Sequence, residues 1–268
     1  MLYKRVISGL LFLPIFYLFA WNLPPIYFTV LVLVAVAVGQ YEFYRMARAR
    51  GLHPLVMPGI VLGALIVLGF YHPLIPVMGG SSFPVTAAML LIMIARLFSS
   101  LSVDGALEDV AATFLGVCYV AMLFAFQVAI RTGDNGRQWL VFLYFIIWAS
   151  DIGAYSIGIP FGKHRLYEKV SPKKSIEGLF GALVASSAMA LLCRVWFMPP
   201  IGAGEAIAIA LLLAVVGTIG DFVESLFKRA AGVKDSGDFI PGHGGILDRM
   251  DSMLFAAPVL FYYLRMRG

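Results

Sequence analysis

Four polar residues near the end of the chain share the spacing of one helix face, i, i+3, i+4 and i+7: Asp221, Glu224, Ser225 and Lys228. The apolar segment before them has about the length of a membrane-spanning helix. An ionised side chain at membrane depth costs roughly 2.5–3.5 kcal/mol. Such a face therefore has a function, or the helix emerges into water there. Emergence into water explains Asp221 alone more easily than it explains the whole face.

A second pair of carboxylates, Asp248 and Asp251, opens the next apolar segment. Acidic side chains are favourable at a helix N-terminus without any ligand, which is the simpler explanation. Two helix ends that carry spaced carboxylates and are joined by a short loop can, however, converge on one point. Hard oxygen ligands of this kind suit Mg²⁺, which binds one or two carboxylates together with substrate phosphate and water. Gly244 and Gly245 would let the backbone approach a ligand closely.

A basic segment lies earlier in the chain, where five cations outnumber two acids: Lys163, Arg165, Lys169, Lys173 and Lys174 against Glu168 and Glu177. Ser171 and Pro172 predict a helix N-cap with proline at the first helical position. Lys173 and Lys174 would then lie in the first turn, where the helix dipole disfavours cations. A bound polyphosphate would explain them, because lysines and exposed N–H groups both attract an anion. Membrane topology alone is the alternative.

Asp151 lies late in another apolar segment, with Tyr155 one helical turn further on. A carboxylate at that depth is rarely inert. The residues leave open whether it binds a metal, binds substrate or pairs with a lysine of the basic segment. Cys118 and Cys193 lie within apolar segments and give no disulfide framework.

The composition indicates a membrane protein. Of the 268 residues, 61% are hydrophobic and 13% are charged, whereas a soluble domain has about 25% charged residues. We expect an all-α polytopic integral membrane protein with about nine transmembrane helices. The expected helices cover residues 4–21, 25–45, 56–71, 83–98, 110–131, 138–160, 172–197, 205–229 and 248–265. The first is predicted to be retained, because no small-residue cleavage site follows it.

The positive-inside rule places the basic loops on the cytoplasmic side when the N-terminus is cytoplasmic. Residues 1–135 are then expected to form scaffold helices, and residues 136–268 to form a catalytic half. Arg265 and Arg267 fall on the opposite side, so the last helix does not fully cross or the count is off by one. The net charge of +5 fits topology and attraction to lipid headgroups, and we expect no nucleic-acid partner.

A long pattern covers residues 225–251: Ser225-x-Phe227-Lys228-Arg229-x4-Lys234-Asp235-x-Gly237-x2-Ile240-Pro241-x-His243-Gly244-Gly245-Ile246-x-Asp248-Arg249-Met250-Asp251. It resembles the signature of the phosphatidate cytidylyltransferases, also called CDP-diacylglycerol synthases. A second set resembles another motif of that family: Asp151, Tyr155, Gly158, Phe161-Gly162-Lys163 and Ser171-Pro172-Lys173-Lys174-x2-Glu177-Gly178. Residues 1 to 135 match the family only as apolar helices.

The resemblance implies that CTP and phosphatidate react to give CDP-diacylglycerol and diphosphate, with Mg²⁺, at the inner membrane of a bacterium. The active site would face the cytoplasm, with membrane lipid around it. The sequence supports no oligomeric state, and a homodimer is one option.

The expected roles follow from the type of each side chain. The expected metal ligands are acidic: Asp221, Asp248 and Asp251, with Asp151 as a further candidate. The expected phosphate and substrate ligands are basic: Lys163, Lys173, Lys174, Lys228, Arg229, Lys234 and Arg249. Ser225 and His243 would orient substrate or metal. Asp221, Lys228, Asp248 and Asp251 form the expected catalytic set. We expect Asp151, Lys173, Asp221 and Asp248 to surround one cavity.

Three alternatives remain open. A CTP-dependent polyprenol kinase would transfer the γ-phosphate to an alcohol and so would not leave cytidine on the lipid. A transporter would carry its charges in the middle of helices and in both halves of the chain. Here the charges lie at helix ends and in the second half. A purely structural membrane scaffold would gain nothing from the insertion cost of these charges.

Overall fold

The computed structural model describes residues 14–71, 83–237 and 244–267, and most of these residues are helical. Their contacts divide the chain into two compact units. The first unit comprises Met1–Thr132 and Phe227–Met250, and the second comprises Gly133–Leu226 and Asp251–Gly268. The predicted division into scaffold and catalytic halves concerns function and stays a prediction.

The elements up to residue 132 belong to the first unit: η1 (Leu18–Asn22), α2 (Pro25–Arg48), α3 (Val56–Tyr71), α4 (Phe83–Leu97), α5 (Ala106–Gly116), η2 (Val117–Met122) and α6 (Leu123–Thr132). Most of the first expected helix lies outside the described residues. The helix expected over 110–131 begins earlier, because Gly105 adopts a φ of 77° and Ala106 starts the helix. A π-helical segment, η2, interrupts its α-helical hydrogen bonding.

The remaining elements are α7 (Gly136–Phe161), β1 (Arg165–Tyr167), β2 (Ser171–Ser175), α8 (Ile176–Trp196), α9 (Ala203–Ala230) and α10 (Leu247–Arg267). The unit boundaries fall within α9 and α10, so each of these helices has residues in both units. The expected bounds of these helices are right within a few residues, except at the start of α8.

Five described helical segments are long and apolar enough to cross a membrane: Pro25–Arg48, Ala106–Thr132, Gly136–Phe161, Ile176–Trp196 and Ala203–Ala230. Two further apolar helices, α3 and α4, are shorter. The helical membrane class is therefore confirmed, whereas the count of nine crossings stays a prediction.

Tyr44 of α2 is the centre of close packing in the first unit. Its side chain is fully buried, and its hydroxyl donates a hydrogen bond to the carbonyl of Thr113 at 3.0 Å. A Cβ at either Gly59 or Gly116 would lie 2.7 Å from Tyr44 Cζ. The two glycines therefore let α3 and α5 approach α2 closely.

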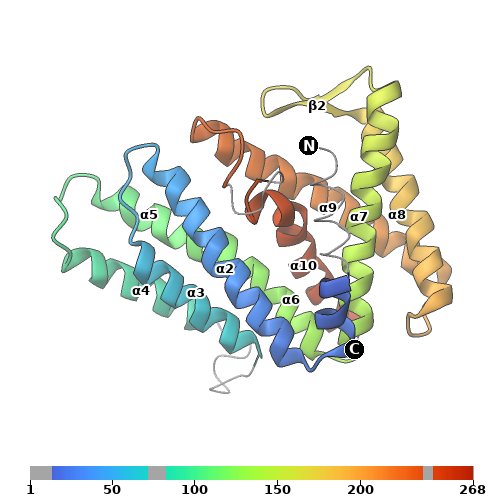
Figure 1. Cartoon of the computed structure of the whole chain (residues 1–268), viewed down its shortest axis with the longest axis horizontal. Helices are drawn as coiled ribbons and strands as arrows, with labels where there is room; N and C mark the ends of the chain where they lie inside the picture. The colour runs from blue at the N-terminus through green and yellow to red at the C-terminus, as the bar shows by residue number, and fades with distance from the viewer. Residues whose placement is uncertain (1–13, 72–82, 238–243, 268) are drawn as a thin grey trace. The chain divides into compact units, whose positions relative to one another are not determined.

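Helices α7 and α8 lie side by side in the second unit (Figure 1), and glycines line their contact. A Cβ at Gly181 would lie 2.5 Å from the carbonyl oxygen of Gly153, and Gly158 faces Gly178 in the same way. Small residues of this kind are common where membrane helices pack closely. The close contact fixes the start of α8 against the end of α7.

The predicted start of the helix after the basic segment is wrong. Ser171–Ser175 forms strand β2, which pairs antiparallel with β1. Ser175 is the actual N-cap, since its hydroxyl accepts a hydrogen bond from the N–H of Gly178 at 3.1 Å. Pro172 is tolerated in β2 because both strands of a two-stranded sheet are edge strands. Lys173 and Lys174 therefore lie on a strand and not in a first helical turn.

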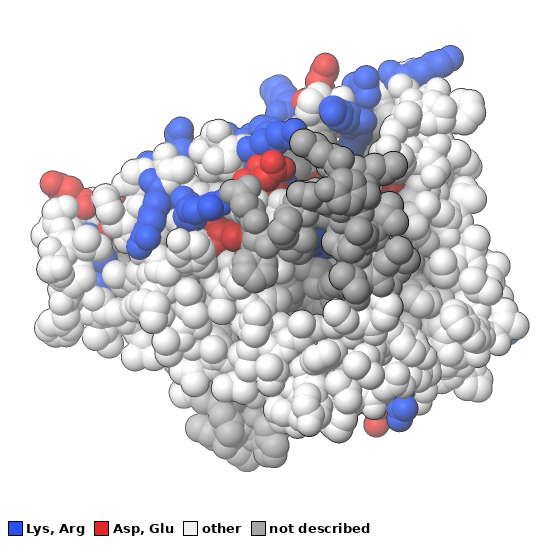
Figure 2. Space-filling view, in the orientation of Figure 1, with Lys and Arg blue, Asp and Glu red and all other residues white. Residues whose placement is uncertain are grey.

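The hairpin formed by β1 and β2 carries several basic residues. On the face in view in Figure 2, Lys and Arg side chains gather towards the end where β2 lies, and fewer are visible at the opposite end. At that opposite end Arg267 forms an ion pair with Glu205 at 3.1 Å. One of the two arginines that disagreed with the predicted topology thus has an acidic partner.

Candidate active site

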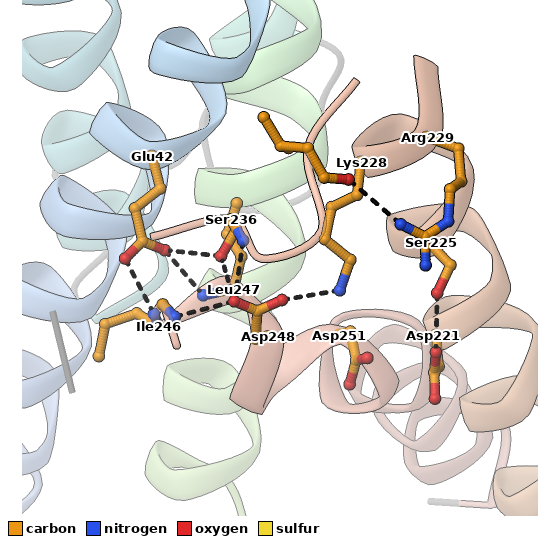
Figure 3. Close-up of polar contacts among 12 residues, drawn as sticks. Glu42, Asp221, Ser225, Lys228, Arg229, Ser236, Ile246, Leu247, Asp248 and Asp251 are labelled. Carbon is orange, nitrogen blue, oxygen red and sulfur yellow. Dashed lines mark hydrogen bonds and ion pairs between the residues drawn. The ribbon is translucent and has the colours of Figure 1, made fainter. Parts of the chain in front are cut away.

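Asp248, in the first turn of α10, is held by donors on both carboxylate oxygens (Figure 3). Its Oδ2 accepts hydrogen bonds from the N–H groups of Ser236 and Gly245 at 2.9 and 2.8 Å, and from the Ser236 hydroxyl at 2.9 Å. Its Oδ1 lies 2.7 Å from the ammonium of Lys228. The Asp248 and Lys228 side chains are only 8% and 12% exposed. Asp248 is therefore rigidly placed, with Oδ1 directed at a cation.

The pKa of Asp248 lies below its ordinary value. Burial raises this pKa, but the hydrogen bond and charge of Lys228 and the N–H groups of Gly245 and Ser236 together lower it by more. Hydrogen bonds to the charged form of a carboxyl stabilise that form. Asp248 is consequently ionised at neutral pH.

Gly244 is needed for this geometry. It adopts a φ of 81°, a conformation that residues with a Cβ rarely take. A Cβ at this position would lie 2.7 Å from Asp248 Oδ2. Gly244 therefore brings the chain close to the carboxylate, whereas the sequence predicted that this glycine would bring it close to a ligand.

Asp221 forms a second lysine–carboxylate pair in the second unit. Lys174 of β2 donates to Asp221 Oδ2 of α9, and both side chains are 28% exposed. The Ser225 hydroxyl, one turn along α9, donates to Asp221 Oδ1 at 3.3 Å. The Lys174 ammonium also lies 4.7 Å from the centre of the Phe222 ring. Lys174 thus contacts the acidic face of α9 from a strand, and not from the first turn of a helix as predicted.

Asp251 feels the negative charges of three other carboxylates in the second unit. Asp221, Glu224 and Asp151 act on it, in decreasing order. Like charges that lie near one another destabilise the ionised forms. A cation would relieve this repulsion, and oxygen donors are the type that Mg²⁺ prefers.

The carboxylates around Asp251 therefore have the oxygen donors that suit Mg²⁺, but among the described residues they do not form a complete metal site. Within residues 14–71, 83–237 and 244–267, no three His, Cys, Asp or Glu side chains are grouped so that they could hold a metal ion. Mg²⁺ often uses only one or two carboxylates and takes its other ligands from substrate phosphate and water. The set is thus compatible with a metal that arrives together with a nucleotide.

Comparison with known proteins gives matches along almost the whole chain. The model of the Cytidylyltransferase family matches residues 3–267. The chain belongs to this family. It is 32% identical over 264 residues to the phosphatidate cytidylyltransferase of Bacillus subtilis, which is 97% of each chain. It is 33% identical to that of Synechocystis sp. over 267 residues, covering 89% of this chain and 88% of the relative. A Staphylococcus epidermidis phosphatidate cytidylyltransferase is 40% identical over 152 residues, 57% of this chain and 58% of the relative.

The other predicted ligands that the structure describes have exposed side chains: Asp151, Lys163, Lys173, Arg229, Lys234 and Arg249. Arg229 donates to the carbonyl of Val233 at 3.3 Å. His243 lies outside the described residues. The roles of all these residues stay predictions. The expected single cavity stays a prediction as well, because Asp248 belongs to one unit and Asp221 to the other.

Glu42 of α2 is the residue that sequence reasoning missed. It is 3% exposed and accepts hydrogen bonds from the N–H groups of Ile246 and Leu247 at 3.1 and 3.0 Å. The signal that singled out Asp151, a carboxylate late in an apolar segment, also applies to Glu42. Arg45, one turn later, made that end of the helix look like an ordinary basic helix terminus.

Proposed function

We propose that this chain is a phosphatidate cytidylyltransferase, which converts CTP and phosphatidate into CDP-diacylglycerol and diphosphate. The names of the relatives that match over most of the chain support this proposal. The structural observation that carries it is the largely buried pair of Lys228, in the last turn of α9, and Asp248, in the first turn of α10. A second such pair, Lys174 and Asp221, supports the same chemistry.

In this reaction a phosphate oxygen of phosphatidate forms a bond to the α-phosphorus of CTP. The bond from that phosphorus to the bridging oxygen breaks, and diphosphate leaves with the electron pair. Such transfers depend on positioning and charge stabilisation and need no covalent intermediate on the protein. We propose that Lys174 and Lys228 stabilise the leaving diphosphate, a role supported by the contact that each makes with a carboxylate oxygen.

Bound Mg²⁺ would neutralise charge on the CTP phosphates. We propose Asp221, Asp248 and Asp251 as its carboxylate ligands, with Asp151 as a further candidate. Asp248 is held by three donors on Oδ2, so its Oδ1 is the oxygen that remains oriented for a second cation. We also propose that the site faces the cytoplasm at the inner membrane, because the hairpin carries the basic residues.

The test is a transfer assay on the purified full chain in detergent, with phosphatidate and CTP labelled at either the α- or the γ-phosphorus. Cytidylyl transfer places the α-label in the lipid and releases the γ-label as diphosphate. Label from the γ-position in the lipid would indicate a kinase instead. Removal of Mg²⁺ with EDTA should abolish transfer, and added Mg²⁺ should restore it. Full activity in EDTA would contradict the metal proposal alone.

A further inference from the structure

We infer that Glu42 is a positioning residue for Asp248, an inference that rests on the proposed function. Glu42 lies on α2, in the half of the chain that the sequence assigned to the scaffold. Asp248 lies on α10 and belongs to the same compact unit. Figure 3 shows the Glu42 carboxylate directed at the turn that carries Asp248.

The first contacts are to the backbone directly before Asp248. Glu42 Oε1 accepts from the N–H of Ile246, and Oε2 accepts from the N–H of Leu247. The first N–H groups of a helix have no acceptor within the helix. A carboxylate is the strongest acceptor that a side chain offers them, and its charge is favourable at a helix N-terminus. Glu42 therefore caps α10 from a different helix.

Ser236 links the two carboxylates directly. Its hydroxyl oxygen lies 3.2 Å from Glu42 Oε2 and 2.9 Å from Asp248 Oδ2. A hydroxyl has one proton, so it donates to only one of them at a time. Arg45 of α2 also holds Ser236, because it donates a hydrogen bond to the Ser236 carbonyl at 3.1 Å. Ser236 thus connects Glu42 to Asp248.

Two glycines in the loop make room for Glu42. A Cβ at Gly237 would lie 2.7 Å from Glu42 Cδ, and one at Gly245 would lie 2.6 Å from the same atom. Neither position has the positive φ that would by itself require glycine. The absence of a side chain there is explained by the approach of Glu42.

The experiment replaces Glu42 by glutamine in the full chain, in detergent. Glutamine keeps the size but presents an NH₂ donor to one of the two N–H donors. We expect kcat to fall on the order of 10- to 100-fold, since misplacing a reacting group by about 1 Å has effects of this size. The Mg²⁺ concentration for half-maximal activity should rise, while KM for CTP changes less. Hydrogen exchange at the amides of Ile246 and Leu247, measured without substrate, should become faster.

Asp109→Asn is the matched control. Asp109 is also a buried carboxylate of the first unit, and it accepts from the backbone N–H of His53 at 2.6 Å and pairs with Arg96 at 3.2 Å. This variant should lose stability but keep the wild-type kcat and Mg²⁺ dependence. If Glu42→Gln does not fold, Ser236→Ala replaces it, and a smaller loss in the same direction is expected.

Wild-type kcat and Mg²⁺ dependence in Glu42→Gln would overturn the inference, as would unchanged exchange at Ile246 and Leu247. Equal losses of kcat in Glu42→Gln and Asp109→Asn would also overturn it, because the effect would then be one of stability. If the wild-type chain transfers no cytidylyl group, the proposed function fails. The exchange measurement still decides whether Glu42 holds the start of α10.

Discussion

Replacing Lys228 with methionine is expected to destabilise the first unit by about 2 kcal/mol, because a hydrogen bond to a charged group contributes about 1.5–3 kcal/mol. The Lys228 ammonium lies 2.7 Å from Asp248 Oδ1, and both side chains are nearly buried. Methionine keeps most of the apolar stem, so the loss reports the charged contact. Asp248 retains three donors on Oδ2, which keeps the loss below the roughly 3–5 kcal/mol of a fully orphaned buried ion.

The assay is thermal unfolding in detergent, where a change of 1 kcal/mol shifts Tm by roughly 2–4 °C in a chain of this size. A double-mutant cycle with Asp248→Asn isolates the pair, and we expect the two losses to fall short of additivity by about 2 kcal/mol. Lys234→Met is the control for stability, since the Lys234 side chain is exposed in the loop that follows α9. Additive losses in the double variant would refute the reasoning, as would equal Tm values for the Lys228 and Lys234 variants.

Three further predictions concern stability. Gly237→Ala should cost about 1–3 kcal/mol, because its Cβ would collide with Glu42, whereas Gly69→Ala, with open space around it, should be neutral or stabilising in a denaturation measurement. Ser175→Ala should cost about 1 kcal/mol by removing the N-cap of α8, and an unchanged Tm would contradict that assignment. The folded-state pKa of Asp248 is lowered, so its ionised form contributes stability above the ordinary aspartate pKa, and this is lost as pH falls through the lower folded value. The stability difference between wild type and Asp248→Asn should therefore shrink as the pH falls into the acid range.

Local sequence was sufficient for most of the described helices. The apolar segments predict most helix bounds, because Gly, Pro or charged residues lie at their ends. The sequence predicted that Gly244 brings the backbone close to a ligand, whereas in the structure it brings the backbone close to Asp248. Lys228 was assigned to phosphate and Asp248 to metal, and the structure shows that these two residues also pair with each other.

The hairpin could not be read from the same signals, because two serines compete as the cap of one helix. Ser171 precedes proline, which is typical of a helix start, whereas Ser175 is followed by an acidic first turn at Glu177. Both patterns are good local signals. Pairing of β2 with β1 decides between them, and pairing between separate segments is not encoded in either short stretch.

The contact between Glu42 and the start of α10 shows a different limit. No periodicity or motif connects a residue of the second apolar segment with the last helix. Only folding brings the carboxylate to the N–H groups of Ile246 and Leu247. The same limit applies to Tyr44, whose two glycine neighbours lie on other helices.

The passage of α9 and α10 through both compact units has a consequence for synthesis on the ribosome. The first unit is completed only by residues 227–250, and the second only by residues 251–268. The early helices therefore lack the last part of their own unit until almost the whole chain has been translated. During that interval Glu42 has none of the loop donors that it later contacts, since Ser236, Ile246 and Leu247 are not yet made. Because these donors are synthesised late, the contacts of Glu42 can form only after the start of the last helix has been translated.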